Sequence, residues 1–284
     1  MNPYIEIIRP GNAIMAVIAV ILMGIVGHNY SIPIILSLIA TFLALGGGNT
    51  INDVFDYKID CINKPNRPIP SGKISLNNAK IYAYSLFIIS IIIGGIITYL
   101  VSSIWPIIVV IGACILEYFY ARNFKSSVLI GNIIVGFLTG LCFIFGGVVI
   151  GAETHGFKII LISLILGFFA ILMTTAREII KDMEDLEGDK KENTRTFPIV
   201  YGKNKAAYLS SGIIFIDTIL CPLLYIEHIF NIYYIIIVFF GMIIFFYSGY
   251  KILKNQETKT CSEVSRNLKV GMMIAFIAFA IGSF

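Results

Sequence analysis

Two clusters of acidic residues share the same internal spacing, although they lie far apart in a chain that is otherwise rich in apolar residues. Each has aspartates at positions i, i+3 and i+7, namely Asp53, Asp56 and Asp60 in the first cluster and Asp182, Asp185 and Asp189 in the second. On an α-helix this spacing places three carboxylates on one face, where they repel one another unless a cation lies against them. Hard cations such as Mg²⁺ bind a few carboxylates, water and substrate phosphates. The pair of clusters therefore predicts a site that holds a diphosphate through Mg²⁺.

Basic side chains accompany both clusters. They are Lys64 and Arg67 after the first cluster, Arg177 and Lys181 at the second, and Arg122 and Lys125 in a short link between apolar segments. Carboxylates, a metal ion and basic groups together suit the departure of a diphosphate. Solvated helix ends are the alternative interpretation of either cluster alone. The matched spacing of the two clusters favours a functional site.

The composition places the chain in a membrane. Hydrophobic residues make up 57% and charged residues 13%, and the mean hydropathy is +0.87, whereas a soluble domain carries about 25% charged residues. Nine apolar segments are long enough to cross roughly 30 Å of hydrocarbon. They are 11–28, 31–51, 77–101, 104–121, 127–150, 157–178, 207–226, 229–249 and 268–284. The sequence predicts an all-α, polytopic membrane protein with about nine transmembrane helices and a single domain over residues 1–284.

The distribution of charge predicts the orientation. If the N-terminus is cytoplasmic, all of the 21 Lys and Arg residues except Lys158 lie on the cytoplasmic side or at the inner ends of helices, as the positive-inside rule expects. Both clusters, in loops at about 52–76 and 178–205, then face the cytoplasm in the cell membrane. The net charge of +4 reflects this orientation and contact with anionic membrane lipids, and it gives no reason to propose nucleic-acid binding.

Two motifs carry a family resemblance. The run Asn52–Asp60 with the tail 63–72, which contains Arg67-Pro-Ile-Pro-Ser-Gly, resembles the first signature of the UbiA-type intramembrane prenyltransferases, and Asp185-x-x-x-Asp189 resembles the second. The resemblance implies an all-α bundle around a central cavity that opens laterally to lipid. It also implies a reaction in which Mg²⁺ binds the diphosphate of a polyprenyl donor, the allylic C–O bond breaks, and an acceptor captures the carbocation.

The resemblance also implies roles for individual residues. The expected metal-binding residues are Asn52, Asp56, Asp60, Asp185 and Asp189, and Asp53 and Asp182 complete the catalytic set as neighbours in the same stripes. The candidates for substrate binding are Arg67, Lys125, Arg122, Arg177, Lys181, Lys64 and Arg9. Among these, Arg67 and Lys125 are expected to hold the diphosphate. Arg9 either reaches the mouth of the site or snorkels to the membrane surface.

The segment before the second signature bears on the acceptor. Family members that prenylate aromatic rings tend to carry Tyr-Asp-x-x-Tyr-Ala there, whereas this chain has Arg177 and Lys181. Two cations favour an acceptor that bears a phosphate. The run 177–189, with 196–202 after it, is similar to the archaeal digeranylgeranylglyceryl phosphate synthases. That similarity implies geranylgeranyl diphosphate as donor, geranylgeranylglyceryl phosphate as acceptor, and an ether bond at the sn-2 hydroxyl.

Two other functions remain open at this point. The first is prenyl transfer to an aromatic acceptor of a quinone or haem pathway. The second is divalent-cation transport, which should place acidic ligands near the bilayer midplane with a path to both sides. The clustering of the carboxylates at one face disfavours transport. Glu117 and Asp217, which lie inside apolar segments, either face a cavity or serve as structural hydrogen-bonding groups.

Overall fold

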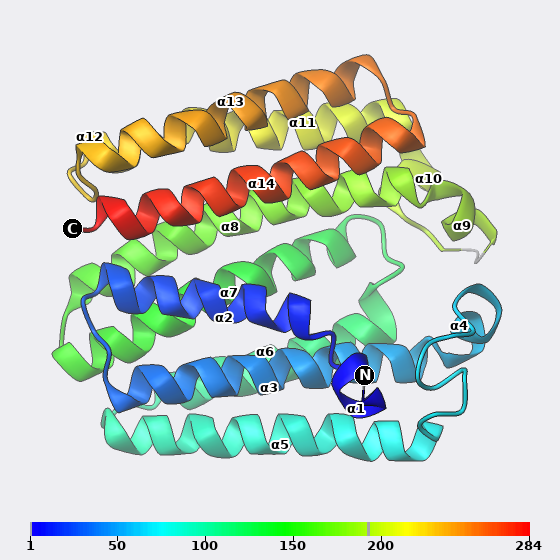
Figure 1. The fold of residues 1–284 in the computed structure, drawn as a ribbon, viewed down its shortest axis with the longest axis horizontal. Coiled ribbons are helices and arrows are strands. Elements are labelled where there is room, and N and C mark those ends of the chain that lie inside the picture. The colour runs from blue at the N-terminus through cyan, green and yellow to red at the C-terminus, as the bar shows by residue number, and fades with distance from the viewer. Residues whose placement is uncertain (1, 192–193) are drawn as a thin grey trace. The chain divides into compact units, whose positions relative to one another are not determined.

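The computed structural model describes residues 2–191 and 194–284, and all of the regular elements in these residues are helices (Figure 1). The helices are α1 Pro3–Ile7, α2 Pro10–Val26, α3 Ile32–Phe55, α4 Tyr57–Asn63, α5 Leu76–Leu100, α6 Trp105–Phe119, the π-helix η1 Tyr120–Phe124, α7 Ile130–Thr154, α8 Phe157–Glu184, α9 Leu186–Lys191, α10 Phe197–Tyr201, α11 Lys203–Leu220, α12 Leu223–Ile226, α13 Ile232–Lys254 and α14 Thr258–Gly282.

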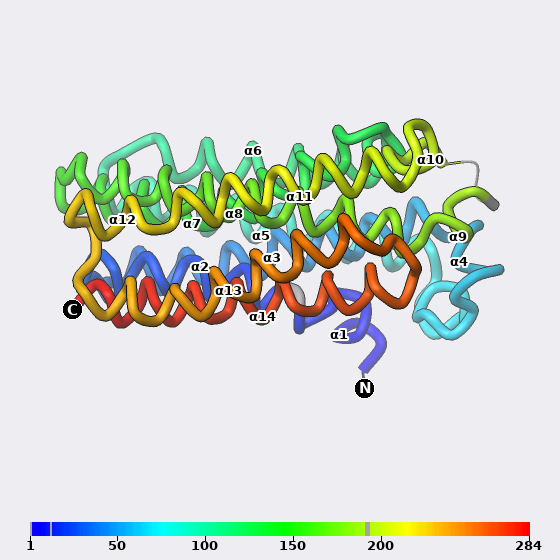
Figure 2. The backbone as a smooth tube through the Cα atoms, turned by 90° about the horizontal axis from the view of Figure 1, so that it is seen from above, coloured from blue at the N-terminus to red at the C-terminus, as the bar shows by residue number. Residues whose placement is uncertain are grey.

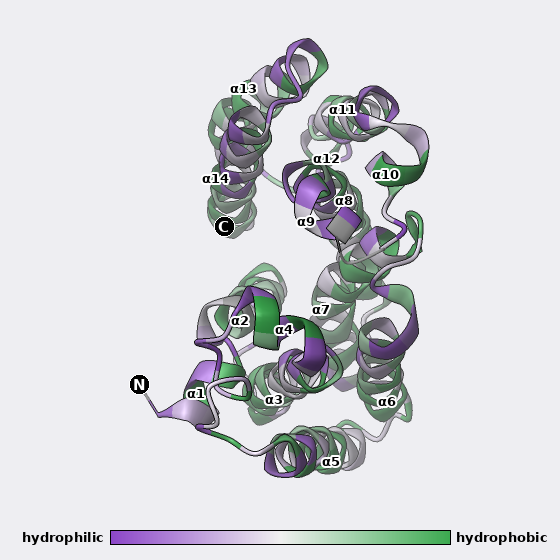
Figure 3. Cartoon of the chain, turned by 90° about the vertical axis from the view of Figure 1, so that its right-hand side faces the viewer, coloured by the Kyte–Doolittle hydropathy of each residue, from purple (hydrophilic) through white to green (hydrophobic). Residues whose placement is uncertain are grey.

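The predicted all-α membrane architecture is confirmed. Within the described residues, eight helical stretches are long and apolar enough to cross a membrane, and α2 is a shorter apolar helix at the position of the first predicted segment. Figure 3 shows hydrophobic residues along the length of these helices. The predicted start of the last segment, at residue 268, was wrong because α14 begins at Thr258. Its first turns carry the charged residues 259, 263 and 266. These residues lower the mean hydropathy of the segment, so hydropathy alone does not predict a helix there.

The chain forms two compact units. Unit 1 contains residues up to 125 together with 141–164, and unit 2 contains 126–140 together with 165–284. In unit 1, α3 packs against α2, α5 and α6. In unit 2, α13 packs against both α11 and α14, and α13 and α14 run side by side (Figure 2). Buried residues of α8, α11, α13 and α14 form one hydrophobic cluster in unit 2.

Glycines on α7 allow a close approach to α8. Within unit 2, a Cβ atom at Gly140 would lie 2.5 Å from the backbone oxygen of Gly167. Within unit 1, a Cβ atom at Gly151 would overlap the Ile160 side chain. Glycine at a helix contact lets the backbones of two membrane helices come together. The α7–α8 hairpin therefore depends on the missing side chains.

Replacing Gly140 by alanine should destabilise the protein. A backbone carbonyl cannot rotate away from the new methyl group, so α7 must move from α8, and such overpacking costs about 1–3 kcal/mol. We expect a lower apparent melting temperature in detergent. Gly212→Ala on α11 is the matched control, since a Cβ atom there meets nothing within 4 Å. Equal melting temperatures for the two variants would show that α7 and α8 are not in close contact at Gly140.

Candidate active site

Both aspartate clusters lie where a long helix is interrupted. α3 ends at Phe55 and α4 begins at Tyr57, so Asp56 occupies the junction. In the second cluster α8 ends at Glu184 and α9 begins at Leu186, which puts Asp185 at the corresponding junction. Each stripe of aspartates is therefore divided between two helices. Helical hydrogen bonding nevertheless continues across each junction, since the Asp60 amide donates to the Asp56 carbonyl and the Asp189 amide donates to the Asp185 carbonyl.

In unit 1, arginines bind the outer two aspartates of the first cluster. The Arg67 guanidinium donates to Asp60 Oδ2 at 2.5 Å and to Asp53 Oδ1 at 3.2 Å. Arg9 also pairs with Asp53. The side chains of Asp53 and Asp60 are only 4% and 3% exposed, so their charges need these partners. Asp53 and Asp60 therefore share one arginine.

The local fold explains how the two arginines reach this cluster. Ile7 and Ile8, just before Arg9, are buried in one hydrophobic cluster with Ile69 and Ile74 of the loop that carries Arg67. The Asn49 side chain also donates to the Ile8 carbonyl at 2.9 Å. The buried isoleucines hold both segments against α3 and α5. The loop after the first cluster is therefore anchored at Ile69 and Ile74.

Asp56 has different partners. The Lys125 ammonium, at the end of η1, pairs with Asp56 Oδ2, and the Asn52 amide donates to the same oxygen at 3.1 Å. Asp56 and Lys125 are 14% and 44% exposed at their side chains. Asn52 Oδ1 is buried and has no hydrogen-bond partner. The three carboxylates of this cluster are thus matched by three basic groups, and a buried amide oxygen is left free beside Asp56.

In unit 2, the aspartates of the second cluster differ in burial and in their hydrogen-bond partners. The buried Asn132 on α7 donates to Asp182 Oδ2 at 2.8 Å. Asp185 is exposed and Asp189 is half-buried. Near the start of the cluster, Glu178 pairs with Arg177 at 2.5 Å and lies 3.7 Å from Lys181. Arg177 Nε is buried without a partner. Two cations therefore share one carboxylate on this face of α8.

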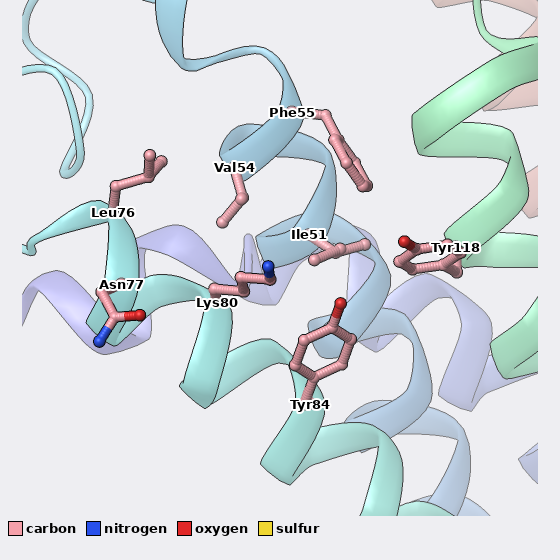
Figure 4. Close-up of a pocket in the computed structure, with 8 residues that line it drawn as sticks. All are labelled: Ile51, Val54, Phe55, Leu76, Asn77, Lys80, Tyr84 and Tyr118. Atoms are coloured by element: carbon pink, nitrogen blue, oxygen red, sulfur yellow. The ribbon is translucent and has the colours of Figure 1, made fainter.

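Two of the predicted basic residues lie away from the carboxylates. Lys64 is exposed at the C-terminal end of α4. Arg122 is exposed and donates to the hydroxyl of Tyr118 at 3.4 Å. Tyr118 in turn lines a small pocket in unit 1, together with Ile51, Phe55, Lys80 and Tyr84 (Figure 4). The structure thus pairs Arg9, Arg67 and Lys125 with the first cluster, and it leaves Lys64 and Arg122 outside it.

The donor atoms of the first cluster suit Mg²⁺. The described residues contain no group of three or more His, Cys, Asp or Glu side chains arranged around a common metal position. The unpartnered Asn52 Oδ1, however, is an oxygen donor next to the Asp56 carboxylate. Mg²⁺ prefers such oxygen ligands and keeps several positions for water and phosphate. In the second cluster, the exposed Asp185 supplies a carboxylate that has access to solvent.

Two residues of this site escaped the sequence analysis. Asn132 gives no signal in the sequence because it lies in an apolar helix far from the motifs. Lys269 on α14 interacts electrostatically with Arg177 and Lys181. A lysine within an apolar segment is costly in a membrane, and this signal could have identified Lys269 from the sequence.

Comparison with known proteins shows that the similarity covers nearly the whole chain. Residues 13–279 match the model of the UbiA prenyltransferase family. The digeranylgeranylglyceryl phosphate synthase of Methanobrevibacter smithii is 57% identical over 284 residues, with 100% of this chain and 99% of that protein covered. The enzyme of the same name from Methanocaldococcus jannaschii is 40% identical, with 100% and 96% covered.

Solved structures agree with these sequence matches. A structure described as giving insights into digeranylgeranylglyceryl phosphate synthase in membranes has a TM-score of 0.83 and 39% identity, with 99% of this chain and 97% of that chain covered. A UbiA homolog from Archaeoglobus fulgidus bound to GPP and Mg²⁺ has a TM-score of 0.65 and 17% identity, with 98% and 99% covered. The second likeness shows the fold alone.

Proposed function

Because the chain belongs to the UbiA prenyltransferase family, we propose that it transfers a geranylgeranyl group from geranylgeranyl diphosphate to the sn-2 hydroxyl of geranylgeranylglyceryl phosphate. The products are diphosphate and an archaeal ether lipid precursor. The identity of 57% over the full length to a digeranylgeranylglyceryl phosphate synthase carries this assignment. The basic pair Arg177 and Lys181 supports it from the structure, because a phosphate monoester can accept charge-assisted hydrogen bonds from both cations. The family match spans both units, which supports the prediction that residues 1–284 act as one prenyltransferase domain.

The carboxylates and basic residues divide the work of donor binding. Asn52, Asp56, Asp60, Asp185 and Asp189 are the proposed Mg²⁺ ligands, with Asp53 and Asp182 as their neighbours. Bound Mg²⁺ would stabilise the negative charge that develops on the leaving diphosphate. Arg67 and Lys125 bind phosphate oxygens of the same group. Lys125 is well placed for this role because its side chain is 44% exposed and its ammonium group lies at Asp56.

In the transfer step, one C–O bond breaks and another C–O bond forms. The allylic C–O bond of the donor breaks, the diphosphate departs with the electron pair, and the acceptor oxygen forms a new C–O bond to the allylic carbon. The hydroxyl proton passes to the departing diphosphate or to a carboxylate of the site. The basic residues of the first cluster favour the step because they bind the diphosphate more strongly as its charge increases.

Analysis of the product tests this function. Purified protein supplied with Mg²⁺, isotopically labelled geranylgeranyl diphosphate and geranylgeranylglyceryl phosphate should yield a lipid with two ether-linked chains that survives alkaline hydrolysis. Mass spectrometry should place the second chain at the sn-2 position. Release of diphosphate without a new ether bond would contradict the proposal.

Lys181→Ala should affect the acceptor selectively. Arg177 and Lys181 lie four residues apart on α8 and both contact Glu178, so a phosphate monoester near this face would gain charge-assisted hydrogen bonds. We expect KM for geranylgeranylglyceryl phosphate to rise on the order of tenfold, with a much smaller change for the donor. An equal loss of donor and metal binding would show that Lys181 only neutralises the acidic stripe.

The chain is a multi-pass membrane protein, and we propose that its active site faces the cytoplasm. The excess of Lys and Arg in the loops that carry the two clusters supports this orientation. In a Cys61→Ser background, Ser71→Cys should react with an impermeant thiol reagent only from the cytoplasmic side. Thr154→Cys, which is exposed at the end of α7, should react only from the outside. The reverse labelling pattern would overturn the orientation.

A further inference from the structure

Lys269 is a basic residue inside a candidate membrane span. It lies on α14, roughly 16 Å along the axis from the first residue of that helix. The residues after it, 270–281, are almost entirely apolar. The Lys269 side chain is exposed within the described structure. Charged residues within such a span are costly and usually face a partner or a ligand.

The surroundings of Lys269 contain more positive than negative charge. Arg177, Lys181, Glu178 and Glu184 all interact electrostatically with it. Arg177 and Lys181 already contact Glu178, whereas none of the ion pairs among the described residues includes Lys269. Three cations are therefore gathered near two carboxylates. Because Arg177 Nε is buried without a partner, the cluster also has a free hydrogen-bond donor.

A shared hydrophobic core holds the two helices that carry these groups. Ala176 and Ile180 of α8 are buried in one hydrophobic cluster with Val264 and Leu268 of α14. Each of the basic residues directly follows one of these anchors in the sequence: Arg177 after Ala176, Lys181 after Ile180, and Lys269 after Leu268. The cationic cluster formed by Arg177, Lys181 and Lys269 is thus carried by two helices that share one hydrophobic core in unit 2.

We propose that Arg177, Lys181 and Lys269 bind the phosphate monoester of a lipid substrate, the prenylated glycerol phosphate acceptor. A phosphate monoester carries between one and two negative charges at neutral pH and several acceptor oxygens, which matches the excess of cations and the free Nε–H donor. The apolar residues of α14 after Lys269 suit the hydrocarbon chain of such a ligand. The inference rests on the proposed function and adds Lys269 as a residue that determines acceptor specificity.

Binding without catalysis tests the proposal. The three probes are geranylgeranylglyceryl phosphate, its dephosphorylated alcohol and geranylgeranyl diphosphate, each titrated into detergent-purified protein without Mg²⁺ and followed by native mass spectrometry. Lys269→Gln should weaken binding of the phosphate lipid on the order of tenfold and leave binding of the alcohol unchanged. Lys269→Arg, which keeps the charge, should retain most of the affinity. Lys259→Gln, on an exposed part of the same helix, is the matched control.

The possible outcomes separate this inference from the proposed function. Equal weakening of the phosphate lipid and the alcohol by Lys269→Gln would indicate a packing role, and equal weakening of the donor would assign the cluster to the diphosphate; either result overturns the inference. Unchanged affinity of Lys269→Gln for the phosphate lipid would do so as well. If Lys269 is needed for binding but no ether product forms, the phosphate site stands and the proposed reaction fails.

Discussion

Asp56→Asn should lower turnover at least about a hundredfold, which is the usual cost when an electrostatic contact that stabilises the transition state is removed. The substitution keeps the size of the side chain but removes the charge that pairs with Lys125. It also removes the carboxylate next to the unpartnered Asn52 Oδ1. Asp185→Asn should have an effect of similar size, since Asp185 lies at the corresponding junction between α8 and α9 in unit 2. Steady-state assays at saturating Mg²⁺ measure both effects.

Two carboxylates outside the aspartate pattern provide controls. Glu187→Gln changes an exposed residue on α9, and Glu6→Gln removes a long ion pair of 3.9 Å with Lys73. Both variants should keep near-normal turnover. Near-normal turnover in Asp56→Asn and Asp185→Asn as well would remove these aspartates from the proposed metal site.

Chelation of divalent cations should abolish transfer completely. The proposed site brings a diphosphate next to carboxylates, and the like charges cannot lie together without a cation between them. The basic residues of the first cluster are too few for this task, because Arg9, Arg67 and Lys125 already balance Asp53, Asp56 and Asp60. An excess of EDTA should therefore stop product formation, and added Mg²⁺ should restore it.

A measurement of stability serves as the control for chelation, because EDTA should stop the reaction without unfolding the protein. The apparent melting temperature in EDTA should stay close to that in Mg²⁺, because the ion pairs of the first cluster and the Asn132 contact of Asp182 hold these residues without a metal. Sustained transfer in EDTA, with the metal content checked by elemental analysis, would contradict a role for Mg²⁺.

Hydropathy alone predicted most of the helices, because segments that cross a membrane must satisfy their backbone groups internally and expose apolar side chains. It failed at the start of α14, where charged residues lie in the first turns of a helix. It also gave no hint of the close α7–α8 contact, although glycines at 136 and 140, and again at 147 and 151, form the small-xxx-small pattern that marks such contacts.

The three aspartates of the first cluster do pair with basic residues, but their spacing could not predict the interruption of each helix at its middle aspartate. The sequence around Asp56 and Asp185 contains no proline, and glycine appears only later, at Gly188. The ion-pair partner of each carboxylate also could not be predicted from the sequence. That Arg67 binds both Asp53 and Asp60 depends on the fold of the loop around Ile69.

The central claim is that the acceptor carries a phosphate, and a competition assay tests it most directly. Purified protein is given Mg²⁺, geranylgeranyl diphosphate and equal concentrations of geranylgeranylglyceryl phosphate and 4-hydroxybenzoate, and both products are quantified by mass spectrometry. The cations on α8 and α14 predict that nearly all of the prenyl group appears on the glycerol phosphate. Efficient prenylation of 4-hydroxybenzoate, with none of the ether lipid formed, would contradict the proposed function.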